Sequence, residues 1–208
     1  MRAFSGNGVG LVTIVVAILL IKWVPSAAAS DIAQVVTVNG SPTVMRAEKR
    51  EPLKRGDGLN AGDAVETDEH AKVKLLLSDD SVLAIGPKSR VVIERMRIEP
   101  AARTARLRVL AGRFQIAIAK FFRGPTDYEI QTPTAVAGVR GTVLWGDTDL
   151  DAICDLEGAV TVRSTQGTSA ATPLNSGQCV HNMAGGTTEP LVPSAAELAA
   201  YLREVTLD

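Results

Sequence analysis

Apolar and polar residues alternate with a period of two in several stretches of the chain, and this pattern constrains the fold more than any other feature. Successive side chains of a β-strand point to opposite faces, so strict alternation is typical of a strand with one buried and one exposed face. The pattern occurs in the residue ranges 71–77, 104–109, 114–119, 127–131 and 160–163.

Turn-forming residues separate these stretches at short intervals. Examples are Asn39-Gly40, Gly86-Pro87 and Gly124-Pro125. Glycine permits a positive φ and proline fixes φ, so such pairs end strands and reverse the chain. Many short strands with regular turns indicate an all-β domain, either a sandwich, a barrel or a solenoid.

The first 29 residues have the pattern of a secretory signal peptide. Arg2 is followed by a mostly apolar run from Val9 to Ile21, and Ala27 and Ala29 form an A-x-A cleavage pattern. We expect cleavage after Ala29 and a periplasmic or secreted product. The alternative is an uncleaved segment that serves as an inner-membrane anchor, although the apolar run is shorter than the roughly 20 residues that such a helix needs.

The two cysteines, Cys154 and Cys179, predict a disulfide, because exported proteins fold in an oxidising compartment. The alternative is a pair of separate buried thiols, since sequence alone does not bring two Cα atoms within range.

Charge is distributed unevenly along the chain. Residues 88–123 carry ten lysines and arginines against two acids, whereas residues 142–208 carry nine acids against two arginines. Arg106 and Arg108 fall on the polar side of one alternating stretch. They are candidate binding residues for an acidic protein surface, an anionic envelope glycan or a lipid headgroup, and the alternative is an ordinary solvated face. No aromatic residues interleave with these arginines as they do on nucleic-acid-binding surfaces, so nucleic acid is not expected as a partner.

The C-terminal region departs from the β pattern. Residues 182–193 have the composition of a linker, and Ser194 with Glu197 forms a capping box ahead of an apolar face at Leu198, Tyr201, Leu202 and Val205. We expect a short amphipathic helix, which packs either on its own domain or on a partner because so short a helix is marginal alone.

Several motifs, in order, resemble the FecR protein domain over roughly residues 55–181. They include Gly62-Asp63-Ala64-Val65-Glu66-Thr67, Asp79-Asp80-Ser81, Pro87-Lys88-Ser89, Leu110-Ala111-Gly112, the stretch from Thr132 to Thr142, and Leu156-Glu157-Gly158. Asp80 stands where the family usually has glycine, so the turn geometry is expected to differ. Cys154 and Cys179 are not part of the common pattern.

The resemblance implies an extracytoplasmic all-β unit similar to short β-helical coils, which in sigma-regulator members relays contact with an outer-membrane receptor. Only eight residues precede Val9, so we expect a stand-alone exported domain without the cytoplasmic sigma-binding segment. Arg140, within the most recognisable stretch, is a candidate partner anchor through its five-donor guanidinium. The alternative is a structural arginine that binds carbonyl oxygens at a sharp corner.

No pattern for catalysis or metal binding stands out. Asp147, Asp149 and Asp151 alternate, but the following residues lack the glycine and glutamate of a calcium loop. Neither His70 nor His181 lies in a zinc motif, and pairing of Cys154 with His181 as a nucleophile would require a free thiol. We expect no enzyme activity, no cofactor and no metal.

These patterns predict three segments: a signal peptide at 1–29, an all-β FecR-like domain at 30–181, short β-helix or solenoid-like or else sandwich-like, and a linker with a C-terminal α-helix at 182–208. The expected function is that of a periplasmic binding or signalling module for an envelope protein or glycan. The alternative is a scaffolding protein that associates with itself through sheet edges or the C-terminal helix.

Overall fold

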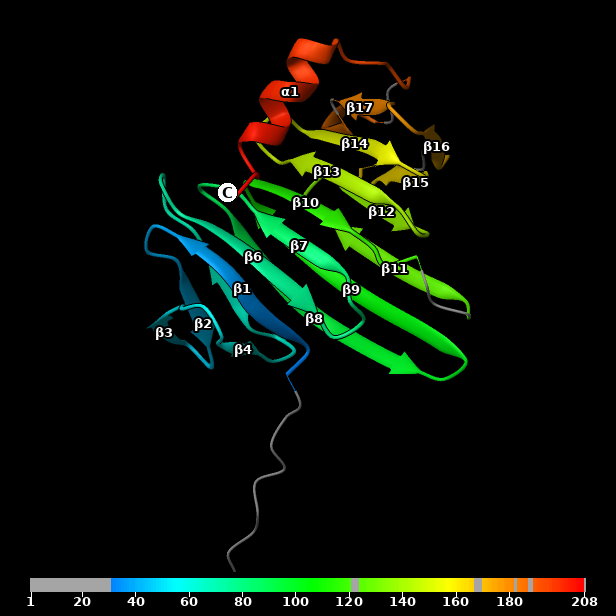
Figure 1. Cartoon of the computed structure of the whole chain (residues 1–208). Helices are drawn as coiled ribbons and strands as arrows, with labels where there is room; N and C mark the ends of the chain where they lie inside the picture. Colours follow the sequence, from blue (N-terminus) through cyan, green and yellow to red (C-terminus); the bar gives the residue numbers. More distant parts are fainter. Residues whose placement is uncertain (1–30, 121–123, 167–169, 182, 187–188, 208) are drawn as a thin grey trace, which may run out of the picture.

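The structure is a computed structural model that describes residues 31–120, 124–166, 170–181, 183–186 and 189–207. The predicted signal peptide lies outside the described residues. Seventeen strands in the described part form two open sheets, and a single-turn 3-10 helix η1 (Met183–Gly185) and one short α-helix follow them (Figure 1). The all-β prediction with a C-terminal helix is therefore confirmed.

We call the two sheets A and B. In the order in which they pair, the eight strands of sheet A are β17 (Cys179–His181), β14 (Ala152–Glu157), β13 (Val143–Asp147), β10 (Arg113–Ala117), β7 (Val82–Ile85), β6 (Lys72–Leu77), β1 (Ala33–Asn39) and β4 (Gly58–Leu59). The nine strands of sheet B are β16 (Thr172–Asn175), β15 (Ala159–Ser164), β12 (Ala135–Val139), β11 (Thr126–Gln131), β9 (Ala102–Ala111), β8 (Arg90–Glu99), β5 (Ala64–Glu66), β2 (Thr43–Arg46) and β3 (Lys49–Pro52).

From β5 onward the chain passes back and forth between the sheets and adds each new strand at the same end. After β5 in sheet B it forms β6 and β7 in sheet A, then β8 and β9 in sheet B, then β10 in sheet A, and so on to β17. Neighbouring strands are antiparallel except for the parallel pair β9 and β11. The result is a sandwich that grows along one axis, as the coils of a solenoid do.

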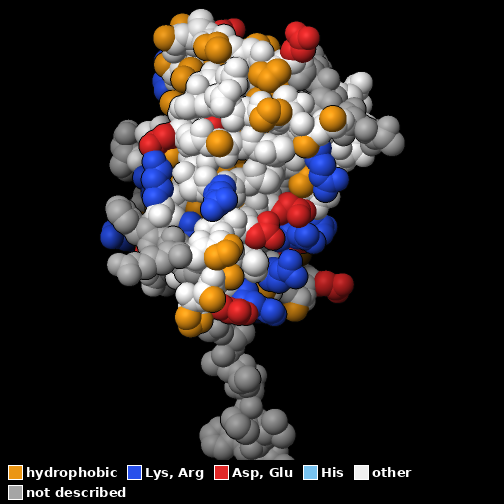
Figure 2. Space-filling view, turned by 90° about the vertical axis from the view of Figure 1, so that its right-hand side faces the viewer, with side chains coloured by type: hydrophobic (Ala, Val, Ile, Leu, Met, Phe, Trp, Pro, Cys, Tyr) orange, Lys and Arg blue, Asp and Glu red, His pale blue; other side chains and the backbone are white. Residues whose placement is uncertain are grey.

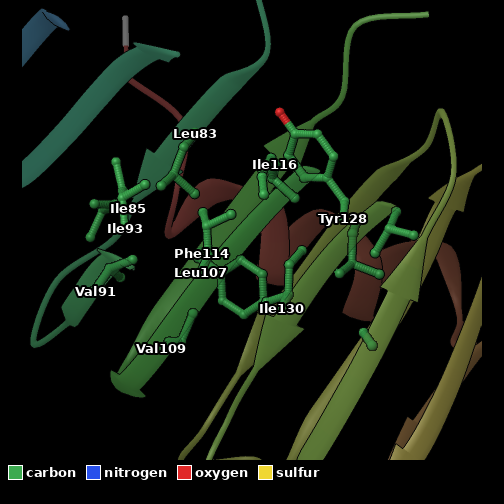
Figure 3. Packing of buried hydrophobic residues seen from close by; sticks show 14 of the residues in the cluster. Leu83, Ile85, Val91, Ile93, Leu107, Val109, Phe114, Ile116, Tyr128 and Ile130 are labelled. Atoms are coloured by element: carbon green, nitrogen blue, oxygen red, sulfur yellow. The ribbon is translucent and has the colours of Figure 1, made fainter. Parts of the chain in front are cut away.

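The main core lies between the two sheets. Sheet A contributes Leu83, Ile85, Phe114 and Ile116, and sheet B contributes Leu107, Val109 and Ile130, among others (Figure 3). The period-two prediction is confirmed, because the apolar positions of all five alternating stretches are buried while their polar neighbours are more exposed. Burial of each such large side chain contributes about 1.5–3 kcal/mol.

A second apolar cluster lies on the outer face of sheet A, beneath the helix α1 (Ala195–Arg203) and the residues that follow it. Trp145 and Tyr201 stack with ring centroids 4.5 Å apart, and Val205 and Leu207 are buried beside them. The predicted capping box is present: the Ser194 hydroxyl accepts from the Glu197 amide at 3.3 Å, and the Glu197 carboxylate accepts from the Ser194 amide at 2.8 Å. The helix therefore packs on its own domain.

A disulfide joins Cys154 and Cys179, as predicted. The two residues lie directly opposite each other on β14 and β17, and both are completely buried in the cluster beneath α1. In the described part of the chain, no helix is long and apolar enough to span a membrane.

Candidate binding face on sheet B

The two outer faces of the sandwich differ in what covers them. Sheet A carries α1 and the C-terminal residues, whereas no described helix or strand lies over the outer face of sheet B (Figure 1). We call the outward side chains of sheet B the candidate binding face. Seven arginines and five acids point outward there: Arg50, Arg90, Arg95, Arg97, Arg106, Arg108 and Arg163, with Glu66, Glu94, Glu99, Asp127 and Glu129.

Alternation along each strand explains why these arginines share one face. In β9, Ala105, Leu107 and Val109 point into the core, so Arg106 and Arg108 point outward. In β8, strict alternation from the inward Ile93 would turn Arg95 and Arg97 inward. A register shift between Ile93 and Arg95 reverses the phase and places both arginines on the outward side. The sequence prediction placed Arg106 and Arg108 on the polar side of their strand, and the structure confirms that placement.

Acids neutralise some of these arginines. Arg106 lies 3.1 Å from Glu129 on the neighbouring β11, and Arg108 forms an ion pair with Glu94 on β8. Glu66 accepts from Arg50 at 2.6 Å and lies 3.4 Å from Arg90. All of these groups are partly exposed, so each pair contributes no more than about 1 kcal/mol to stability.

Other arginines of the face have no acidic partner. Arg95, Arg97 and Arg163 are exposed and make no ion pair within the described residues. Arg95 lies directly opposite Arg106 in the β8–β9 ladder. Charges of both signs are interspersed across much of the side of the molecule that Figure 2 shows. The face therefore has an excess of positive charge available to a ligand.

Arg140 follows the last residue of β12 and is exposed. Within the described part of the chain its side chain makes no hydrogen bond or ion pair. The corner beside it is held by the hydroxyl of Thr142, which donates to the carbonyl oxygens of Arg140 and Ala159 at 3.2 Å each. The corner thus has a donor other than the Arg140 guanidinium, and a binding role for Arg140 stays a prediction.

A shallow groove of about 600 Å³ runs along the end of the face beside Arg108. Its lining includes Leu110, Gln131, Thr132, Pro133 and Thr165. Thr132 and Pro133 begin the stretch that most resembles the FecR domain, so the groove joins that stretch to the arginines of the face.

One of the ten basic residues between positions 88 and 123 is not on the surface. Arg103 lies in the interior, where it pairs with Asp79 and donates to Thr126 at 3.0 Å. The Tyr128 hydroxyl also donates to Asp79, and burial raises the pKa of Tyr128 far above its usual range. Asp79 belongs to the Asp79-Asp80-Ser81 turn, so this network anchors a motif of the predicted domain. Asp80 itself has φ 66°, the left-handed conformation that glycine adopts readily.

Other motifs of the resemblance also hold the fold together. Gly112 has φ 83°, and a Cβ there would lie 2.2 Å from the Ser89 hydroxyl. That hydroxyl accepts from the Arg113 amide at 2.8 Å, and the Thr67 hydroxyl accepts from the Ser89 amide at 2.9 Å. The motifs around Thr67, Ser89 and Gly112 therefore meet at one corner of the sandwich and serve packing.

Two of the three alternating aspartates, Asp147 and Asp151, have other partners. Asp147 lies 2.7 Å from the Arg113 guanidinium, and Asp151 accepts from the Thr134 hydroxyl and from the Ala184 amide. Over the described ranges, no three histidine, cysteine or acidic side chains form a group that could hold a metal ion. Cys154 is in the disulfide, so the thiol that pairing with His181 would need does not exist in this state.

The described residues thus form an all-β sandwich of two open sheets, with arginines on the uncovered outer face of sheet B. The FecR protein family profile matches residues 63–170, and the chain belongs to the FecR family. Two crystal structures of a proposed anti-sigma factor from Parabacteroides distasonis ATCC 8503 have a similar fold, each with a TM-score of 0.53 and 14% sequence identity.

These matches cover 67% of this chain and 64% or 63% of the Parabacteroides protein, so the shared region is under two thirds of that protein. At this identity the likeness establishes the fold alone. No curated protein sequence matches the chain.

Proposed function

We propose that this FecR-family protein is an exported, non-catalytic signalling module that binds a protein of the bacterial cell envelope through the candidate binding face. Membership of the FecR family supports a regulatory role, and so does the fold shared with a proposed anti-sigma factor. The signal-peptide pattern of residues 1–29 supports export to the periplasm.

The observation that carries this proposal is the uncovered face of sheet B with its excess of arginine. Arginine is enriched at protein interfaces because its planar guanidinium binds carboxylates in a bidentate manner. Arg106 and Arg108 lie near the centre of this face, since β9 is flanked by four strands on each side in sheet B. Arg140 extends the positive charge along β12.

The sheet edges are poorer candidates for a partner strand. Among the described strands, β3 and β16 form the edges of sheet B, and they contain Pro52 and Pro173. In sheet A, the edge strand β17 forms an isolated β-bridge from Cys179 to Leu191. The strand at the opposite edge, β4, is only two residues long. Proline and short strands protect sheet edges from added strands. A partner is therefore expected on the face.

Self-association through the edges or the helix is the alternative function. The same edge features oppose it, and α1 already packs against Trp145 of its own domain. A mature chain that remains monomeric at high concentration in analytical ultracentrifugation would exclude it.

The proposal can be tested by cross-linking in living cells of the source bacterium. A photoreactive amino acid is placed at Thr161, which is exposed on the candidate binding face, and in a matched control at Ala199, exposed on α1. We expect Thr161 to form an adduct with one envelope protein and Ala199 to form none. Retention of the chain in the cytoplasm, or the same adducts from both positions, would contradict the proposal.

A further inference from the structure

Four arginines of the candidate binding face form a compact group on β8 and β9. Arg95 and Arg97 are two residues apart on β8, and Arg106 and Arg108 are two residues apart on β9. Arg95 lies directly opposite Arg106. Directly opposed residues have Cβ atoms about 4.5–5.5 Å apart, and like charges in that position destabilise a sheet. Folding therefore gives no reason for this pairing.

The acids of the face offset this charge only in part. Glu129 and Glu94 pair with Arg106 and Arg108, while Arg95 and Arg97 have no ion pair in the described structure. The Nε atom of Arg106 is also buried without a hydrogen-bond partner among those residues. The exposed guanidinium groups of Arg95 and Arg97 are thus the ones that remain available to a ligand.

The spacing of these arginines matches that of an extended polypeptide. Two residues of a strand span about 6.4–6.8 Å, and any extended segment repeats its own side chains over the same distance. Carboxylates on every second residue of such a segment would each meet one guanidinium of a row. A charge-assisted bidentate pair forms wherever they meet.

We propose that the β8–β9 arginine group binds an extended acidic segment of a partner protein, with aspartate or glutamate at alternate positions. This inference rests on the proposed function and specifies the partner. The acids Glu94, Glu99, Asp127 and Glu129 stand among the arginines or beside them, with Glu99 two residues beyond Arg97 on β8. They would repel a uniformly charged polyanion, whereas a segment with neutral residues between its acids avoids them.

Two peptides of equal composition test the proposal on the chain that comprises residues 30–208. One alternates glutamate with threonine over ten residues, and the other carries the same residues as a glutamate block followed by a threonine block. Binding is measured by fluorescence anisotropy at low ionic strength. We expect the alternating peptide to bind about tenfold more tightly and to weaken as salt is raised, because exposed charges are screened.

Arg95→Gln with Arg97→Gln should remove this preference, and the matched control Arg55→Gln, an exposed arginine in the turn before β4, should preserve it. Unchanged melting temperatures confirm that the variants fold. Equal binding of the two peptides, or no effect of the double substitution, would overturn the inference. Dextran sulfate that binds more tightly than the alternating peptide would also overturn it, in favour of a general polyanion surface.

If the peptide test fails, the cross-linking experiment still tests the proposed function independently. Cross-linking from Thr161 would still identify an envelope partner that contacts the face by other chemistry. If neither the preference for the alternating peptide nor a cross-link from Thr161 were observed, the proposed function itself would be contradicted.

Discussion

Arg103 and Asp79 form an ion pair inside the protein, with the Arg103 Nη1 atom 2.9 Å from the Asp79 Oδ2 atom. Their side chains are 3% and 2% exposed. The guanidinium also lies 5.6 Å from the centre of the Tyr128 ring, and the Ser81 hydroxyl donates to the same Asp79 oxygen at 2.9 Å. Every group in this network contacts another, so the buried charges are compensated.

Removal of one partner of this pair should be strongly destabilising. We expect Arg103→Met to lower the free energy of unfolding by about 3–5 kcal/mol, because Asp79 would be left as an uncompensated buried charge. Chemical denaturation at neutral pH measures this. The double variant Arg103→Met with Asp79→Leu should recover part of the loss, and Arg108→Ala on the surface should cost less than about 1 kcal/mol. A single variant as stable as the wild type would contradict the network.

Loss of the disulfide should also destabilise the fold. Cys154 and Cys179 are 25 residues apart in sequence, so the bond restricts the unfolded chain and contributes about 3 kcal/mol. Cys154→Ala with Cys179→Ala should lower the unfolding free energy by that amount, and the reduced wild type should match the double variant. The absence of any difference between oxidised and reduced protein would show that the bond does not form.

Asp155 should make stability depend on pH. It is completely buried on β14, and in the described structure neither carboxylate oxygen has a hydrogen-bond partner. Burial raises the pKa of the Asp155 carboxyl, although the nearby Glu157 backbone opposes this shift. The folded state therefore holds this proton more tightly than the unfolded state.

The sign of the pH effect follows from linkage. Stability is fully present below the ordinary aspartate pKa of about 3.9 and falls as pH rises towards the raised pKa of the folded state. Asp155→Asn cannot ionise, so we expect it to be more stable than the wild type at pH 7 and similar to it near pH 3.5. Unfolding free energies measured across this range test the prediction, and parallel curves for the two proteins would refute it.

Tyr201 should control the environment of Trp145. In the chain without residues 1–29, Trp145 is the one tryptophan, because the other is Trp23. Tyr201→Ala removes the ring stacked on it and should lower the unfolding free energy by about 2 kcal/mol. Tryptophan emission should shift to longer wavelength and become accessible to acrylamide. Ala199→Ser, exposed on the same helix, should change neither property, and unchanged emission in Tyr201→Ala would contradict the packing of α1.

Much of this structure could be predicted from alternation alone. In β9, the apolar residues Ala105, Leu107 and Val109 occupy alternate positions. This alternation predicted both the strand and the outward direction of Arg106 and Arg108. The same phase includes Arg103, which therefore points inward. Arg103 is one of the ten basic residues of 88–123, and its phase was a signal that could have placed it in the interior.

Other features could not be predicted because they depend on distant parts of the chain. The register shift that brings Arg95 opposite Arg106 is a local irregularity of β8 with no glycine to mark it. Trp145 points away from the main core, and it is buried by α1 and the C-terminal residues, including Tyr201, Val205 and Leu207. The side on which α1 packs decides which sheet keeps an open face, so the candidate binding face required the structure.

The affinity of the envelope protein cross-linked through Thr161, measured by calorimetry, tests the central claim most directly. The wild type is compared with Arg95→Ala/Arg106→Ala/Arg163→Ala and with the control Arg55→Ala. Binding should weaken at least about tenfold in the triple variant and stay unchanged in the control, with both variants folded. Equal affinity of the triple variant and the wild type would show that the arginine-bearing face of sheet B is not the binding surface.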